Sequence, residues 1–153
     1  MPHFVFGPSG GTGGNSGVTD SDVPVLEEPL NTNTRVIQVE VRGGEFVDAI
    51  QFTHLRNNDT TLLTLAQHGG PGGHEQRLDI NREEHITKIS GRYGDFVDSI
   101  TIETDKGQKL EAGGAGGLGD YTYEAPPDFE IVGFYGRSGE FVDAVGVVLR
   151  KIP

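Results

Sequence analysis

Apolar and polar residues alternate along short stretches of this chain, as they do in β-strands that have one buried face. In residues 36–41, for example, Ile37, Val39 and Val41 fall on one side of an extended chain and polar residues fall on the other. No window of 11 or more residues repeats with the 3.6-residue period of a helix, and Gly or Pro interrupts every candidate. The pattern predicts an all-β chain.

The predicted strands are short and are separated by turn residues. Besides 36–41 and the stretch after each copy of the motif described next, we expect strands at residues 2–6, 23–26, 61–66, 77–80, 85–90, 108–112, 121–124 and 129–135. A turn is expected at 31–33 and a long loop at 7–22. The count is about twelve strands, which suggests three four-stranded units.

One motif, Arg-x-Gly-[Glu/Asp]-Phe-Val-Asp-[Ala/Ser]-[Ile/Val], occurs three times, in residues 42–50, 92–100 and 137–145. Its aspartates, Asp48, Asp98 and Asp143, are 50 and 45 residues apart. Self-similarity at such an interval is typical of one structural unit used repeatedly. The motif therefore predicts three equivalent positions in the fold.

A second motif, Gly-Gly-x-Gly-Gly, has the same multiplicity and occupies residues 10–14, 69–73 and 113–117. Glycine makes up 24 of the 153 residues, about twice its usual share. Because these glycines are concentrated in turns and in the three loops, they indicate special backbone geometry more than disorder.

Each motif aspartate is in phase with apolar residues that we expect to be buried. Phe46, Asp48, Ile50 and Phe52 share one face of the strand that follows the first turn. A lone carboxylate in a dry core would cost several kcal/mol, on the order of the penalty for any unpaired buried charge. We therefore expect the aspartates at strand ends, where the core opens to water.

A fixed carboxylate beside glycine amides matches a particular kind of ligand. The carboxylate accepts hydrogen bonds and the amides donate them, so the pocket suits neighbouring hydroxyl groups, which do both. Adjacent hydroxyls of a sugar fit this description. A single Gly-x-x-x-Asp is most often a turn capped by its own aspartate, and it is the threefold repetition that favours a ligand role.

Other residues of the motif have simpler interpretations. The three phenylalanines are expected to pack rather than to stack on a ligand. The arginines are expected to point outward and to form weak exposed ion pairs with the acidic residues of the same turns: Arg42 with Glu45, Arg92 with Asp95, and Arg137 with Glu140.

Three alternative functions compete with sugar binding. A glycoside hydrolase would use paired carboxylates such as Glu45 and Asp48. A calcium site would need six to eight oxygen ligands, on the order of twice what one motif supplies. A structural β-prism domain without any ligand is the third.

Composition excludes several further classes. The formal charge of -11 and the pI near 4.7 disfavour nucleic acid as a partner. There is no cysteine, and His68 and His74 lack a third ligand at metal spacing, so we expect neither a metal nor another cofactor. No apolar stretch is long enough to insert in a membrane and no signal peptide is visible, which suggests a cytoplasmic or non-classically secreted protein. Residues 1–153 are expected to form a single domain.

With Gly-x-x-x-Asp followed by Ala-Ile or a similar pair, in an all-β chain of this size, the sequence resembles the jacalin-related lectins. That resemblance implies a type I β-prism, with three four-stranded sheets about a pseudo-threefold axis. It also implies a non-enzymatic lectin that binds terminal mannose or glucose on high-mannose glycans, and the intact Gly10-Gly11 resembles the mannose-preferring members. Most members carry one or two complete motifs, whereas this chain carries three.

In that family the aspartate accepts hydrogen bonds from O4 and O6 of the sugar, and main-chain amides complete the site. Carried over, Asp48 would act with loop 69–73, Asp98 with 113–117 and Asp143 with 10–14; Pro71 has no N–H and is expected to alter the first of these. A homodimer would double the valency, and the sequence leaves monomer and dimer open. The implied binding residues besides the aspartates are Gly44, Glu45, Phe46, Val47, Gly94, Asp95, Phe96, Val97, Gly139, Glu140, Phe141, Val142, Gly10, Gly11, Gly69, Gly70, Gly113 and Gly114.

Overall fold

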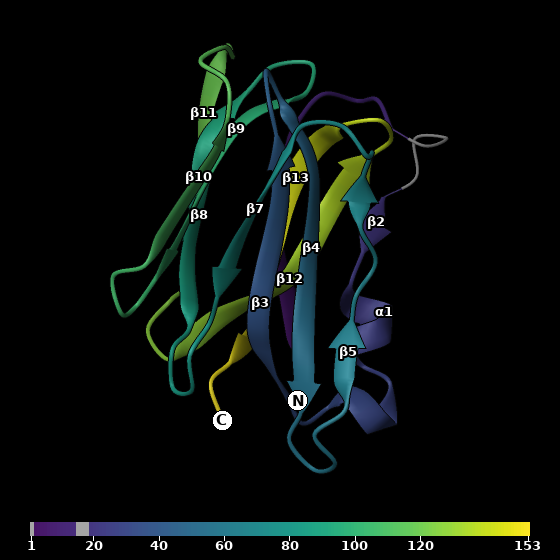
Figure 1. The fold of residues 1–153 in the computed structure, drawn as a ribbon, viewed down its shortest axis with the longest axis vertical. Coiled ribbons are helices and arrows are strands. Elements are labelled where there is room, and N and C mark those ends of the chain that lie inside the picture. Colours follow the sequence, from purple (N-terminus) through teal and green to yellow (C-terminus); the bar gives the residue numbers. More distant parts are fainter. Residues whose placement is uncertain (1, 15–18) are drawn as a thin grey trace.

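The computed structural model describes residues 2–14 and 19–153, and within them the chain forms three antiparallel β-sheets (Figure 1). The strands are β1 (His3–Gly10), β2 (Asp20–Ser21), β3 (Thr34–Gly43), β4 (Val47–Arg56), β5 (Leu62–Thr64), β6 (His68–Gly69), β7 (His74–Asp79), β8 (Ile86–Tyr93), β9 (Val97–Thr104), β10 (Lys109–Gly113), β11 (Gly119–Glu124), β12 (Phe129–Ser138) and β13 (Val142–Lys151).

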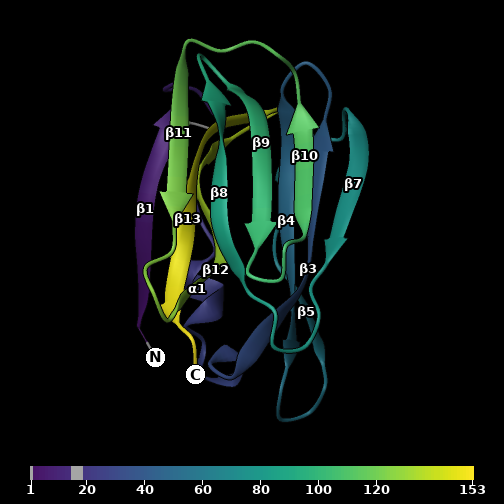
Figure 2. The same ribbon diagram turned by 90° about the vertical axis from the view of Figure 1, so that its left-hand side faces the viewer.

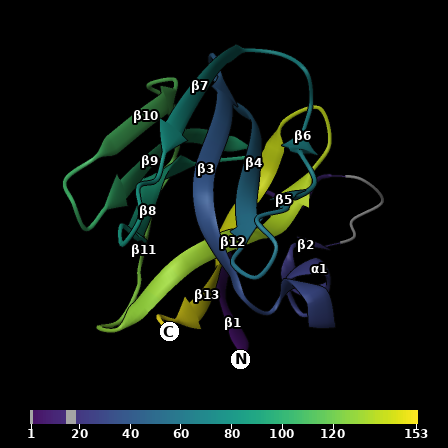
Figure 3. The ribbon, with the colours of Figure 1, turned by 60° about the horizontal axis from the view of Figure 1, so that its bottom comes forward.

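Each sheet has a long hairpin at its centre and shorter strands on both sides. The strand orders are β1-β13-β12-β2, β10-β9-β8-β11 and β5-β4-β3-β7, and β6 also pairs with β4. β5 and β6 pair with different parts of β4, so they form one interrupted outer strand. The three sheets surround a common core (Figure 3). The expected all-β prism is confirmed, with a fifth strand in one sheet.

The first sheet joins the two ends of the chain. β1 pairs with β13 over His3↔Arg150 to Gly10↔Ala144. Both termini consequently lie at the same end of the molecule, the lower end in Figures 1 and 2. This pairing carries the first glycine loop to the hairpin of the last motif.

One local expectation was wrong. Residues 23–26 are not a strand but the short helix α1 (Val23–Leu26). The turn expected at 31–33 begins at the last residue of a 3₁₀ helix, η2 (Pro29–Asn31), and continues as a bend over residues 32–33. Pro24 fits the first helical turn because its missing N–H is not needed there. Leu26 is buried against β12 at Gly133, where a Cβ would lie 3.3 Å from Leu26 Cδ1. No helix in the described ranges is long and apolar enough to cross a bilayer.

A β-bulge changes the predicted face of β3. The register with β4 shifts between Val36 and Gln38. The extra residue reverses the alternation, so Val36 is buried with Val39 and Val41, whereas Ile37 is only half-buried. The strand faces that were predicted to be buried after the motifs do reach the core. Their residues Ile50, Phe52, Ile100 and Ile102 are fully buried.

Far from the motif turns, His54 is completely buried in the core. Its Nε2 donates to the carbonyl oxygen of Val132 (2.8 Å), so Nδ1 accepts from the hydroxyl of Thr34 (3.0 Å). The neutral ring satisfies both contacts. Burial lowers the pKa of His54 from 6.5 to about 4.

We predict that this histidine makes folding stability depend on pH. The unfolded chain takes up a proton near pH 6.5 and the folded chain near pH 4, so stability falls as pH drops through that interval. The loss is on the order of 3 kcal/mol. Urea unfolding of the wild type and of His54→Gln between pH 7.5 and 4.5 measures it. The variant should lose less stability on acidification, and equal slopes for the two proteins would contradict the prediction.

Candidate functional site

The three motif aspartates lie at one end of the prism, the upper end in Figure 1, where the turns of the central hairpins meet. Each is the second residue of its strand, β4, β9 or β13. Asp48, Asp98 and Asp143 are 6%, 7% and 5% exposed. As predicted, the carboxylates mark the rim of the core.

The glycine loops cross directly over these turns. Loops 69–73 and 113–117 connect outer strands on opposite sides of one hairpin, β6 to β7 and β10 to β11, so the chain must pass over the hairpin end that carries the aspartate. Residues 10–14 continue from the outer strand β1 to the equivalent place on the third hairpin, where Gly13 lies beside the Asp143 carboxylate. The three pairings inferred from the sequence are therefore those in the structure. We call them the Asp48 site (with residues 69–73), the Asp98 site (113–117) and the Asp143 site (10–14).

The same contacts fix all three loops. The first glycine pairs with the residue that follows the aspartate, as in Gly69↔Ala49. The amide of the second glycine donates to the carbonyl oxygen of the aspartate itself. These distances are 3.0 Å for Gly70 to Asp48, 2.8 Å for Gly114 to Asp98 and 2.9 Å for Gly11 to Asp143.

Glycine is required where the loop touches the hairpin. Gly69 has φ +126°, and a Cβ on it would lie 2.0 Å from the carbonyl oxygen of Asp48. A Cβ on Gly72 would lie 2.7 Å from Asp48 Oδ2, so any side chain there would occupy the space beside the carboxylate. Gly116 and Gly13 are equally close to their aspartates, at 2.9 and 2.6 Å. At all three sites a side chain at this glycine would therefore collide with the carboxylate.

The carboxylates of Asp48 and Asp98 have unused hydrogen-bonding capacity. No donor within the described ranges bonds to their Oδ atoms, although both side chains are nearly buried. Burial raises the pKa of all three aspartates above the ordinary value of 3.8, and a nearby arginine offsets part of the increase. The arginines concerned are Arg42 for Asp48, Arg92 for Asp98 and Arg137 for Asp143.

These arginines do not pair with the acidic residues of their own turns, so that expectation was wrong. Their guanidinium groups bind the carbonyl oxygens of the glycine loops. Arg42 Nε donates to Gly72 (2.9 Å) and Nη2 to Gly73 (3.2 Å). Arg92 makes the same two contacts with Gly116 (3.3 Å) and Gly117 (2.9 Å). Arg137 donates to the carbonyl of Gly11 (2.6 Å).

Strand pairing explains the error. Arg42 is directly opposite Glu75 in the β3–β7 register, and the two side chains form an ion pair at 3.8 Å. Arg92 is opposite Asp120 and pairs with it at 2.7 Å. A partner on the adjacent strand is closer than one beyond the turn. Strand adjacency cannot be read from the alternation of residues, so the role of the arginines as supports of the loops was not predicted.

The acidic residues that precede the phenylalanines contact the neighbouring site instead. A Cβ on Gly114 would lie 2.4 Å from the carbonyl oxygen of Glu45, so the first turn packs against the loop of the Asp98 site. In the same way Glu140 meets Gly70, and Asp95 meets Gly11. The main chain of Glu45 therefore lies against the loop of the Asp98 site, and its side chain is exposed.

Phe46, Phe96 and Phe141 meet between the three sites. Their ring centroids are 5.1 to 5.3 Å apart in all three pairs, with the rings tilted or edge-on. The rings are half-buried rather than fully buried as the residue phase predicted, because they cap the core at the turns instead of entering it. As expected, they pack against one another.

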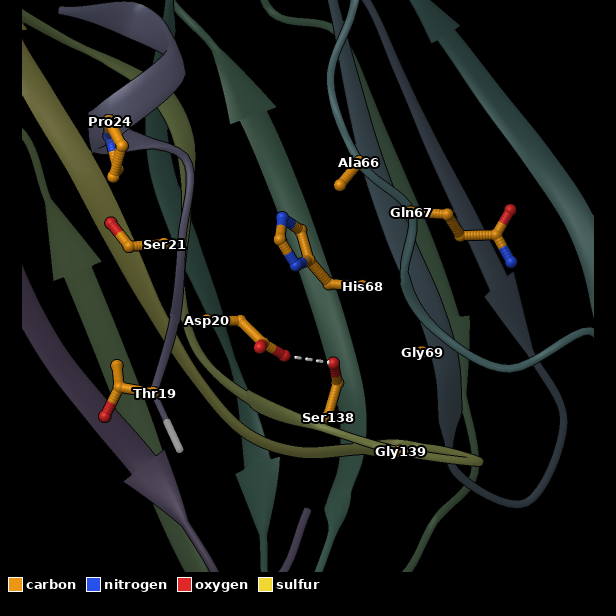
Figure 4. A pocket seen from close by; sticks show the side chains of 10 residues that line it. All are labelled: Thr19, Asp20, Ser21, Pro24, Ala66, Gln67, His68, Gly69, Ser138 and Gly139. Atoms are coloured by element: carbon orange, nitrogen blue, oxygen red, sulfur yellow. Dashed lines mark hydrogen bonds between the residues drawn. The ribbon is translucent and has the colours of Figure 1, made fainter. Parts of the chain in front are cut away.

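A concave surface accompanies the sites. At the Asp98 site a hollow of about 270 Å³ is lined by the carboxylate and by Phe46, Phe96 and Leu118. Another groove, of about 440 Å³, runs between β2 and β6 (Figure 4). In it the hydroxyl of Ser138 donates to Asp20 (2.6 Å), and His68 is held by Asp22 (2.7 Å) and stacks on Phe134. The contact between Ser138 and Asp20 lies within one sheet, whereas His68 and Asp22 join β6 of one sheet to the chain that follows β2 of another.

Two other expectations concern the loops and metals. Despite Pro71, loop 69–73 makes the same amide and arginine contacts as loop 113–117, and the proline removes only one main-chain donor. In the part of the chain that the structure describes, no three His, Cys, Asp or Glu residues are grouped so that they could hold a metal ion.

Comparison with known proteins agrees with the geometry. The model of the "Jacalin-like lectin domain" family matches residues 6–148. Horcolin of Hordeum vulgare is 32% identical over 146 residues, which cover 92% of each chain. A mannose/glucose-specific lectin of Parkia platycephala is 28% identical over 95% of this chain and 31% of its own length. The structure of Malaysian banana lectin superimposes with a TM-score of 0.78 at 25% identity, over 98% of this chain and 99% of the other. The chain belongs to the jacalin-like lectin domain family, whose members bind carbohydrates.

Proposed function

We propose that this protein is a lectin with three sites for the terminal mannose of high-mannose glycans, and that it has no catalytic activity. The observation that carries the proposal is the threefold repetition of one geometry. At every hairpin end an aspartate of raised pKa lies under a glycine loop that leaves the space beside its carboxylate open.

The chemistry of the site suits neighbouring hydroxyl groups. At neutral pH the carboxylate only accepts, so two sugar hydroxyls such as O4 and O6 donate to it. The main-chain amides of the turns Gly44–Val47, Gly94–Val97 and Gly139–Val142, together with those of the loops, supply donors for the sugar oxygens. The name of the Parkia platycephala relative, mannose/glucose-specific lectin, supports mannose as the ligand.

Three weak sites at one end of a rigid prism favour branched ligands. Each hydrogen bond exchanged from water contributes about 0.5 to 1.5 kcal/mol, so a single mannose binds weakly. Simultaneous occupation by branches of one glycan raises avidity by about 10² to 10⁴ when the branches span the sites.

The direct test is an NMR titration with methyl α-mannoside that follows the amides of the three motif turns. Three sets of shifts, one for each site, are expected. Shifts confined to fewer turns would reduce the number of sites, and no shifts at millimolar sugar would refute the proposal. A glycan array then identifies the preferred linkage.

We predict that Asp48→Asn, Asp98→Asn and Asp143→Asn each abolish one site and leave the other two intact. The amide has the same shape but replaces one acceptor oxygen with a donor. Because burial of the charged carboxylate is unfavourable, stability at pH 7 should be unchanged or slightly higher. The same titration, combined with thermal unfolding, distinguishes this result from misfolding, which would remove all three sites together.

Sugar binding should also be lost on acidification. The loss should occur at a higher pH than it would for an aspartate with an ordinary pKa. Protonation turns one acceptor oxygen of the carboxylate into a donor, and the raised pKa places this step above 3.8. Calorimetric titrations from pH 7 down to the ordinary pKa should show that affinity has already decreased before the pH reaches 3.8. Full affinity down to the ordinary pKa would show that the carboxylates do not bind the sugar.

Arg42 should support the Asp48 site without touching the ligand. Arg42→Met removes the two hydrogen bonds to Gly72 and Gly73, so we expect mannoside affinity at this site to fall about three- to tenfold, the equivalent of one or two net hydrogen bonds. The Asp98 and Asp143 sites should keep their affinity. Arg77→Met is the matched control, since exposed Arg77 also pairs with Glu75 but makes no contact with the loop. Equal effects of both variants would contradict a positioning role.

A further inference from the structure

The Asp98 site differs from the other two in the residue that follows its glycine loop. Leu118 occupies this position, whereas His74 follows the loop of the Asp48 site and Asn15, which lies outside the described residues, follows the third. Leu118 is 93% exposed, the most exposed of the large apolar side chains in the described ranges. A leucine side chain that stays in water contributes no hydrophobic free energy to folding.

Leu118 is nonetheless held in a fixed place. Its amide donates to the carbonyl oxygen of Tyr93 (2.8 Å), and the next residue, Gly119, pairs with Tyr93 at the start of β11. The Leu118 amide nitrogen would lie 4.0 Å from a Cβ on Gly94, and the same Cβ would lie 3.6 Å from Asp98 Oδ1. The side chain therefore projects from an anchored backbone at the mouth of the site.

The hollow of the Asp98 site is lined by residues of two chemical kinds. Its polar side consists of Asp95 and Asp98 with Gly94 and Gly117. Its apolar side consists of Leu118 with the half-buried rings of Phe46 and Phe96. When the hydroxyls of a sugar bind the polar side, a substituent at another position of that sugar contacts the apolar side.

We propose that Leu118 and Phe46 form an apolar subsite, which makes the Asp98 site select mannosides that carry an apolar group on the anomeric oxygen. This inference rests on the proposed function and adds a specificity to one of its sites. When O4 and O6 of the sugar bind the carboxylate, the anomeric carbon lies across the ring from C4. A substituent on the anomeric oxygen therefore points away from the polar side of the hollow. Covering Leu118 with an apolar group removes its surface from water. At the Asp48 site the corresponding residue, His74, is polar.

The test uses chains with one remaining site. Asp48→Asn with Asp143→Asn keeps the Asp98 site, and Asp98→Asn with Asp143→Asn keeps the Asp48 site. Calorimetry measures the affinities of phenyl α-mannoside and methyl α-mannoside for each. At the Asp98 site we expect the phenyl glycoside to bind about three- to tenfold tighter, the factor that corresponds to burying some tens of Å² of apolar surface. At the Asp48 site the ratio should be close to one.

Leu118→Ser in the chain that keeps the Asp98 site should bring its ratio close to one. Leu62→Ser, at another exposed leucine remote from the site, should leave the ratio unchanged. Both positions are exposed, so neither change should affect folding. A ratio that is equal at the two sites, or that survives Leu118→Ser, overturns the inference alone. If neither single-site chain binds methyl α-mannoside, the proposed function fails and this inference fails with it.

Discussion

Everything at the upper end of the prism depends on the close approach of a glycine loop to the carbonyl oxygen of a motif aspartate. The amide of the second glycine bonds to this oxygen at 2.8 to 3.0 Å in all three sites, and the first glycine lies so close that no Cβ would fit. The loop can come this near only because it has no side chains. The contact places the carboxylate and the loop amides around one common space. In loops 69–73 and 113–117 it also links the outer strands of the sheet across the hairpin.

The buried carboxylates lower the stability of the folded protein and are the groups that are proposed to bind the ligand. Three carboxylates are nearly buried with raised pKa values, and within the described ranges Asp48 and Asp98 receive no hydrogen bond to compensate. The arginines offset part of this cost and hold the loop carbonyls. The phenylalanine cluster closes the core between the sites. A charge that costs free energy in the empty protein is kept at each position where a hydroxyl-rich ligand is proposed to bind.

Because the motifs are repeated, much of the fold and of the candidate site could be predicted from the sequence. Alternation of apolar and polar residues indicated an all-β fold, three copies of each motif indicated three equivalent positions, and the residue phase placed Asp48 at the rim of the core. What the sequence lacked was strand adjacency. Arg42 was assigned to Glu45 because the two are close in sequence, whereas Glu75 lies opposite it on β7. The bulge in β3 and the helix at Val23–Leu26 depend on packing of the whole sheet, which alternation does not report. The subsite at Leu118 combines residues of two repeats and has no local signal.

The most direct measurement is a crystal structure of the protein soaked in methyl α-mannoside at millimolar concentration. The account predicts one sugar at each of the three sites, with two of its hydroxyls within hydrogen-bonding distance of Asp48, Asp98 or Asp143 and its ring under the adjoining glycine loop. Empty sites, or sugar bound elsewhere on the prism with these carboxylates uninvolved, would contradict it.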